Sequence, residues 1–165
     1  MLDSKTINSL PFSGKLRVRV CGILIEGGKV LLLKHNKIGS LGYLWSPPGG
    51  GVEFGQSVID ALKKEFLEET NLIVEVENYL FLNEHMDDHY HAIELFFSVK
   101  RVSGDLALGS DPELPLSEQI LAEARYFDDE ELRQIPEEAI HSAFSTINNL
   151  KEILNIRGLI TFKVY

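Results

Sequence analysis

Three glutamates with helical spacing, Glu65, Glu68 and Glu69, are the residues of this chain best suited to chemistry. Residues three and four apart lie on one face of an α-helix, so the three carboxylates would lie together. There they repel one another by roughly 0.2–0.5 kcal/mol per pair, and the C-terminal half of a helix is unfavourable for anions. A cation would relieve both effects, and oxygen ligands suit a hard divalent ion such as Mg²⁺ or Mn²⁺. The alternative is an acidic surface exposed to water beside Lys63 and Lys64.

The segment that carries these glutamates predicts a helix over residues 57–70. Four apolar residues recur there at helical spacing: Val58, Ala61, Leu62 and Phe66. Asn71 follows them, and asparagine tolerates the left-handed conformation in which helices commonly end. Residues 36–51, just before the helix, are rich in glycine and contain Pro47 and Pro48, so we predict a loop there.

The remaining pattern predicts a mixed sheet and one more helix. Strand-like composition recurs in five segments: 16–25, 30–33, 72–82, 91–102 and 125–127. The first two would form a hairpin around Gly27-Gly28, and the tail 158–165 alternates like a final strand. Pro136 would open a second helix, whose apolar face carries Ile140, Phe144, Ile147, Leu150 and Ile153. We therefore expect the α+β class, an α/β/α sandwich with a mixed central sheet.

The composition, with 44% apolar and 25% charged residues, is that of an ordinary folded domain. We expect a polar lead-in over residues 1–15 and a single domain over residues 16–165. Cys21 is the only cysteine, so the chain forms no internal disulfide and needs no oxidising compartment. Inside an apolar strand, this thiol is most typical of a small buried side chain.

Charge and apolar runs argue against two classes of partner. The 16 Lys and Arg residues stand against 25 Asp and Glu residues, and the net charge of −9 argues against binding of duplex nucleic acid. The most apolar stretches, such as residues 20–25, are much shorter than the roughly 20 residues of a membrane helix. The N-terminus lacks the basic start and apolar run of a signal peptide. These observations predict a soluble, cytoplasmic protein that does not bind membranes.

The segment 50–72, GGVEFGQSVIDALKKEFLEETNL, resembles the Nudix box, G-x5-E-x7-R-E-U-x-E-E-x-G-U, in which U is an apolar residue. Matching residues are Gly50 at the first position, Glu65 in R-E, Phe66 at the first U, Glu68 and Glu69 in the E-E pair, and Leu72 at the end. The preceding hairpin, the PPGG sequence at 47–50 and the later strands extend the resemblance over residues 16–155.

Three positions depart from the box. Gln56 stands where the family has glutamate, Lys64 where it has arginine, and Asn71 where it has glycine. Asn71 is a mild change, because asparagine is the usual substitute at a left-handed helix end. Lys64 keeps the charge but lacks the planar fork that can hold a carboxylate in two places. Gln56 removes one negative charge from the metal region. These changes could lower activity or alter metal preference.

The resemblance implies metal-dependent hydrolysis of a nucleoside diphosphate linked to another group, with water attacking phosphorus. Mg²⁺ or Mn²⁺ would bridge carboxylates and phosphate oxygens, and would reverse the local sign of this acidic protein. The resemblance also implies Glu65 and Glu69 as principal ligands, and Glu68 as a ligand or as the group that orients the water. The backbone carbonyl of Gly49 or Gly50 would complete the coordination.

Further residues are candidates for the reaction, each with a plainer alternative: Arg17, Arg19, Trp45, Tyr90 and Glu118. Glu118 is a candidate general base or an ordinary exposed glutamate. Arg17 and Arg19 could reach substrate phosphates from the first strand, or face water. Trp45 could stack on a base, although a lone tryptophan usually lies in the core. Tyr90 lies 18 residues past the box, similar to a tyrosine of Nudix enzymes that cleave dinucleoside polyphosphates, or it is a packing residue.

Three functions are compatible with these residues. The first is a metal-dependent Nudix pyrophosphohydrolase. The second is a catalytically inactive Nudix-like domain that binds a nucleotide as a sensor, which the retention of all three glutamates disfavours. The third is an isomerase of isoprenoid diphosphates, which would need a catalytic cysteine, and Cys21 lies in the wrong setting.

The substrate stays open between nucleoside triphosphates, dinucleoside polyphosphates and nucleotide sugars. Residues 73–90 contain no proline, which disfavours ADP-ribose. Histidines and aspartates within the polar segment 83–91, expected to be a loop, could bind a transition metal, but in a loop they are typically solvated. The tail 158–165 could pair within its own sheet or across a homodimer.

Overall fold

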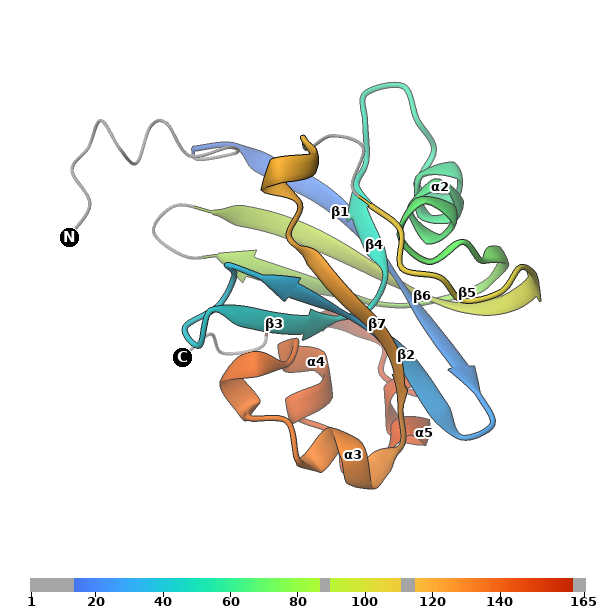
Figure 1. The fold of residues 1–165 in the computed structure, drawn as a ribbon, viewed down its shortest axis with the longest axis vertical. Coiled ribbons are helices and arrows are strands. Elements are labelled where there is room, and N and C mark those ends of the chain that lie inside the picture. The colour runs from blue at the N-terminus through green and yellow to red at the C-terminus, as the bar shows by residue number, and fades with distance from the viewer. Residues whose placement is uncertain (1–13, 87–89, 111–114, 162–165) are drawn as a thin grey trace.

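A computed structural model of the chain describes residues 14–86, 90–110 and 115–161 (Figure 1). It contains an 8-stranded mixed sheet whose main path runs β3-β2-β1-β6-β5-β8, with β4 paired to β1 and β7 paired to β2. The strands are β1 (Leu16–Glu26), β2 (Lys29–Asn36), β3 (Tyr43–Ser46), β4 (Gly49–Gly51), β5 (Ile73–Met86), β6 (His91–Ser103), β7 (Leu121–Phe127) and β8 (Gly158–Ile160).

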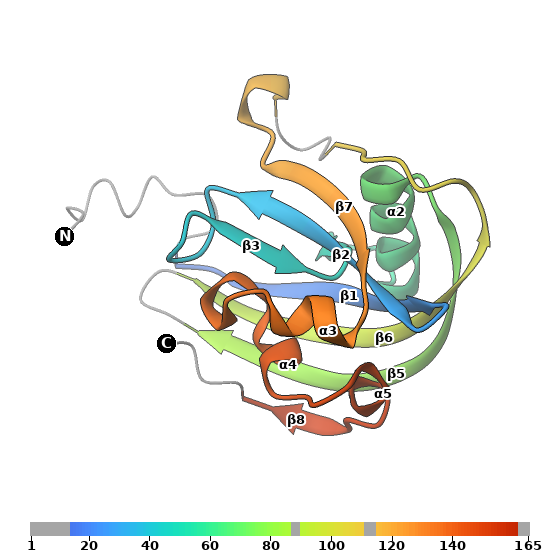
Figure 2. The same cartoon turned by 60° about the horizontal axis from the view of Figure 1, so that its bottom comes forward.

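Helices cover both faces of this sheet, as Figures 1 and 2 show. The helical elements are α2 (Val58–Thr70), α3 (Asp129–Arg133), α4 (Ser142–Ser145), α5 (Leu150–Ile153) and the 3-10 turns η1 (Leu116–Glu118) and η2 (Glu137–Ala139). One apolar cluster joins α2 to the sheet, and another joins the sheet to α4 and α5. The α+β class expected from the sequence is confirmed.

The predicted hairpin is confirmed, since β1 and β2 pair in antiparallel fashion around Gly27-Gly28. Strands β5 and β6 are longer than expected. β5 continues to Met86 and β6 begins at His91, so much of the polar segment 83–91 is strand rather than loop. Residues 87–89 lie outside the described residues. Pairing between two long strands supplies hydrogen bonds that a polar sequence alone does not reveal.

The prediction of a loop over residues 36–51 is partly wrong, because β3 and β4 lie within it. β3 pairs with β2, placing Trp45 opposite Lys34. β4 consists of three glycines and pairs with β1. Glycine is rare in strands because it has no side chain to pack. Here that absence lets the backbone approach its neighbours closely.

The single helix expected from Pro136 is wrong. The chain instead forms η2, an extended Ile140 that bridges to Trp45, and then α4 and α5. Each short helix begins at its own cap: His141 accepts from the N–H of Ala143, and Asn149 accepts from that of Lys151. Such local caps favour separate turns over one continuous helix. The apolar residues are still buried: Ile140, Phe144, Leu150 and Ile153.

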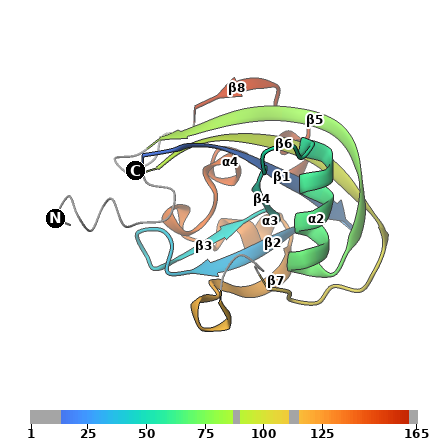
Figure 3. The same ribbon diagram turned by 90° about the horizontal axis from the view of Figure 1, so that it is seen from above.

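The tail forms the outer strand of the sheet, since β8 runs parallel to β5, as Figure 3 shows. The predicted final strand is thus confirmed over Gly158–Ile160, and residues 162–165 lie outside the described residues. None of the helices in the described ranges is long and apolar enough to cross a bilayer.

Helix α2 has the boundaries expected from its sequence. The Ser57 side chain accepts from the N–H of Asp60 at its start, and Asn71 ends it with a left-handed φ of 58°. The helix packs on β1 at Gly22, where a Cβ would lie 2.3 Å from the ring of Phe66. This close approach sets the distance between the helix and the sheet.

We expect Gly22→Ala to lower the free energy of unfolding by about 1–3 kcal/mol, because the added methyl overpacks the contact with Phe66. Phe66→Leu would also destabilise the protein by leaving space. The double variant should lose less than the sum of both changes, by more than about 0.5 kcal/mol. Urea denaturation of the three variants measures this, and additive losses would contradict a steric coupling.

Candidate active site

The glycine strand β4 brings the carboxylates of α2 against the main chain. Gly50 lies opposite Val20 of β1 in the sheet, and a Cβ on Gly50 would lie 2.5 and 2.6 Å from the carboxylate oxygens of Glu65. A Cβ on Gly49 would lie 2.0 Å from the carbonyl oxygen of Val20. Position 49 therefore requires glycine, whereas at Gly50 the carboxylate of Glu65 occupies the space of the missing side chain.

Glu69 is fixed more firmly than an exposed glutamate would be. It is only 7% exposed, and its Oε2 accepts from the backbone N–H of Gly49 at 3.0 Å. His35 Nε2 lies 3.9 Å from the other carboxylate oxygen, and His35 Nδ1 lies 3.3 Å from the hydroxyl of Ser46. Sequence reasoning missed His35, which lies near Glu69, and Ser46, which contacts His35 because β2 and β3 pair.

A segment expected to be loop supports the end of α2 that carries the glutamates. The N–H of Gly109 donates to the carbonyl of Glu69 at 2.9 Å, and the N–H of Ala107 donates to that of Thr70 at 3.1 Å. The last carbonyls of a helix have no partner within it. These bonds satisfy two of them and hold residues 68–70 in place.

The oxygen donors beside β4 fit a hard divalent ion. The carboxylates of Glu65 and Glu69 both face the glycine backbone, whose carbonyl oxygens are further donors. Within the described ranges, no three acidic, histidine or cysteine side chains already surround one point. Mg²⁺ needs no such cage, because it commonly uses one or two carboxylates with water and substrate phosphate oxygens.

Two of the departures from the box, Gln56 and Lys64, meet at Glu53. Gln56 Oε1 accepts from the backbone N–H of Glu53 at 3.2 Å, and Lys64 Nζ lies 3.0 Å from Oε1 of the same residue. The hydrogen bond with Glu53 is the main cause that raises the pKa of Lys64; burial opposes it, and the charges of Glu68, Glu53 and Glu65 add to the rise. Lys64 therefore stays positively charged beside the acidic face of α2.

A family model described as the NUDIX domain matches residues 15–146. The chain belongs to the Nudix hydrolase family. The match includes the glycine strand and all three glutamates of α2, which confirms the resemblance seen in the sequence.

Relatives of this Nudix chain include a protein of Methanocaldococcus jannaschii named ADP-ribose pyrophosphatase. It is 33% identical over 113 residues, which are 67% of this chain and 61% of that relative. The matched part therefore spans less than two thirds of the relative's length.

Solved structures with the same fold include an ADP-ribose pyrophosphatase of Streptococcus suis, with a TM-score of 0.60 and 20% identity, over 87% of this chain and 98% of that one. A MutT protein of Methanosarcina mazei matches with a TM-score of 0.62 and 17% identity, over 88% of this chain and 94% of that one. At these identities the likeness shows the fold alone.

The other predicted site residues lie in different parts of the fold. Arg17 and Tyr90 come together, with Arg17 Nη1 3.5 Å from the hydroxyl of Tyr90. Trp45 packs edge-on against Phe127 with ring centroids 4.7 Å apart and is 7% exposed, so it has no open face for a base. Of the two expectations for Trp45, its position therefore matches a residue of the core. Glu118 is exposed on η1, and no hydrogen bond or ion pair joins it to α2 in the described part of the chain.

Arg19 belongs to a buried polar network that sequence reasoning did not find. Glu94 is buried, accepts from the amide of Asn83 at 2.7 Å, and lies 4.0 Å from Arg19 Nη1. His141 Nε2 is 3.0 Å from Glu94. Because Nδ1 of this ring accepts from the N–H of Ala143, Nε2 carries the proton and donates to Glu94. A lone glutamate within the apolar run AIELFFSV was the available signal.

This network keeps Glu94 ionised. Burial alone would raise the pKa of Glu94, but its interactions with His141, Arg19 and Asn83 lower that pKa to about 2. The carboxylate links β6 to β1, to β5 and to the start of α4. It therefore fixes the C-terminal layer on the sheet.

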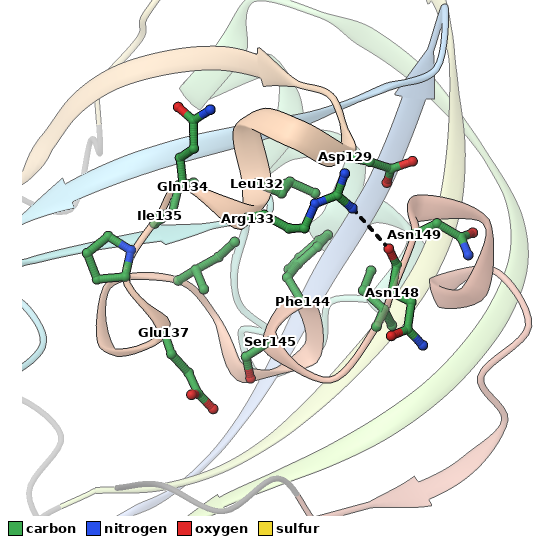
Figure 4. Close-up of a pocket in the computed structure, with 13 residues that line it drawn as sticks. Asp129, Leu132, Arg133, Gln134, Ile135, Glu137, Phe144, Ser145, Asn148 and Asn149 are labelled. Carbon is green, nitrogen blue, oxygen red and sulfur yellow. Dashed lines mark hydrogen bonds between the residues drawn. The ribbon is translucent and has the colours of Figure 1, made fainter.

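A cavity of about 440 Å³ lies between α3, η2 and α4 (Figure 4). Arg133 is the only cation among its lining residues, and Figure 4 shows its guanidinium turned toward the backbone oxygen of Asn148, 3.3 Å away. Neither the glycine strand nor the glutamates of α2 line this cavity. We therefore do not assign the reaction to it.

We expect acid to destabilise the wild type through Glu94. Because its folded pKa is about 2 and its ordinary value 4.5, its contribution is present above pH 4.5 and is lost as pH falls toward 2. Glu94→Gln should lower the free energy of unfolding at pH 7 by on the order of 3 kcal/mol, since Arg19 loses its counter-ion. It should also flatten the fall between about pH 4.5 and pH 2.

Urea denaturation at a series of pH values measures both effects. The matched control is Glu75→Gln, which breaks an exposed ion pair with Lys100 and should cost less than about 1 kcal/mol. Equal pH dependence in the wild type and Glu94→Gln would contradict the assignment.

Proposed function

We propose that this chain hydrolyses a phosphoanhydride bond in a nucleoside diphosphate linked to another group, with the help of a divalent ion held beside β4. The observation that supports this proposal best is the contact between the glycine strand and the carboxylates of Glu65 and Glu69. A strand of three glycines has little value for packing. It is useful where carboxylates and a phosphate chain must both reach the backbone.

Each residue then has a distinct role. Glu65 and Glu69 hold the ion, with a backbone carbonyl of Gly49 or Gly50. The hydrogen bond from Gly49 fixes one oxygen of Glu69 and leaves the other for the ion. Glu68, half-buried on the same helix face, is a ligand or orients the attacking water. When bound, Mg²⁺ or Mn²⁺ neutralises charge on the phosphate oxygens and lowers the pKa of water.

We propose Glu68 or Glu118 as the general base. These are the two candidate glutamates that are not principal ligands of the ion. Glu68 lies on the helix that carries the ligands, whereas Glu118 lies on η1. A base must come within hydrogen-bond distance of the water, directly or through one other water. The position of Glu68 therefore favours it over Glu118.

The substrate is proposed to be a nucleoside diphosphate joined to a sugar or to further phosphates. The name of the archaeal relative makes ADP-ribose the first compound to test, although residues 73–90 contain no proline. Nucleoside triphosphates, dinucleoside polyphosphates and nucleotide sugars complete the panel.

We expect metal-dependent release of phosphate, pyrophosphate or a nucleoside monophosphate from at least one compound of this panel. Glu69→Gln should lower kcat/KM by at least about 100-fold, because it removes a ligand charge. The control Glu77→Gln changes an exposed glutamate on β5 and should leave the rate unchanged. Binding of nucleotides without turnover of any compound would contradict the hydrolase and favour the sensor.

Gly50→Ala tests the supporting observation directly. The added methyl would lie within 2.6 Å of both carboxylate oxygens of Glu65, at the flexible end of that side chain. The protein should therefore fold, with the carboxylate displaced. We expect a melting temperature close to that of the wild type, and a loss of activity and of Mn²⁺ affinity similar to that of Glu65→Gln. Full activity in Gly50→Ala would show that the contact is not needed.

A further inference from the structure

An open cavity of about 500 Å³ adjoins the end of the glycine strand. It is lined by residues 16–18 at the start of β1 and by residues 51–54, which lead from β4 toward α2. Gly51 takes part in this cavity and directly follows Gly50, which contacts Glu65. The cavity therefore begins one residue along the strand from the glycine that contacts Glu65.

Phe54 is fully exposed on this cavity, although the loop that carries it is held in place. The next-door residue Glu53 pairs with Lys64 of α2, and its N–H donates to Gln56. An exposed ion pair contributes less than about 1 kcal/mol. Together with the backbone hydrogen bond of the same residue, however, it restricts a short loop. The backbone beside Phe54 is thus held, while its ring faces solvent instead of being buried.

Cationic and apolar groups lie side by side around Phe54. Arg17 lines the cavity, and a Cβ on Gly51 would lie 2.6 Å from its Nη2. Leu16 and Val18, on either side of Arg17 in the chain, are both exposed. A guanidinium binds phosphate oxygens, and an aromatic face beside apolar residues binds a planar ring. Together they match a phosphorylated ligand that carries a nucleobase.

We propose that this cavity binds the nucleoside end of the substrate, with Arg17 contacting a phosphate and Phe54 stacking on the base. The inference rests on the proposed function, because it takes the phosphates to lie along the glycine strand. In this subsite the base is held only by stacking on one aromatic face. Stacking is tolerant of base identity, so we expect similar affinity for purine nucleotides with different edges.

Calorimetric titration of AMP and of ribose 5-phosphate, both with Mg²⁺, tests this subsite. Phe54→Ala should weaken AMP binding by roughly tenfold and leave ribose 5-phosphate unchanged, because only AMP has a base to stack. Arg17→Gln should weaken both ligands. Phe54→Tyr should restore AMP binding. Leu159→Ala, which removes an exposed apolar side chain on β8, should change neither.

The outcomes separate this inference from the hydrolase proposal. Equal affinities of the wild type and Phe54→Ala for AMP would overturn the subsite even if the wild type hydrolyses nucleotides. Failure of the wild type to bind AMP would also overturn it. AMP binding that depends on Phe54, without turnover of any compound, would support the subsite and overturn the hydrolase. Because Phe54 is fully exposed, its variants should melt as the wild type does.

Discussion

The approach of two carboxylates to a backbone without side chains is the constraint on which this structure depends. Gly49 cannot carry a Cβ because the carbonyl of Val20 occupies its place, and a Cβ on Gly50 would displace the carboxylate of Glu65. The strand must therefore pair with β1, and α2 must cross it at a fixed height. The contact between Gly22 and Phe66 sets that height from the other end of the interface. Packing in the core and geometry at the site are thus parts of one arrangement.

The same arrangement explains how anions are tolerated near the C-terminal end of a helix. The partial negative charge there comes from carbonyls without partners. Ala107 and Gly109 donate to two of these carbonyls, and Gly49 donates to the carboxylate of Glu69 itself. Lys64 adds a full positive charge on the preceding turn. The fold therefore lowers the cost of the acidic cluster, and the carboxylate oxygens that it holds against β4 are of the kind that binds a divalent ion.

Local patterns predicted what local interactions determine. The hairpin at Gly27-Gly28 and the helix ending at Asn71 depend on residues close in sequence, and both were predicted. β4 was missed because a run of glycines carries no strand signal until its partner is known. The helix expected from Pro136 was wrong because caps at His141 and Asn149 divide a pattern that its apolar spacing could not resolve. The Glu94 network joins residues distant in sequence, so only the fold reveals it.

The departures of this chain from its family's box are better understood as a pair than as two losses. Lys64 has one ammonium group, so it cannot hold a carboxylate at two points as arginine can. It instead pairs with Glu53, while Gln56 accepts from the backbone of that same residue. Glu53, three residues closer to the glycine strand, thus interacts with both side chains. These two contacts hold the backbone of the loop that carries Phe54. Gln56 and Lys64 therefore contact the loop that leads from β4 to α2. The carboxylates of Glu65 and Glu69 still lie against β4.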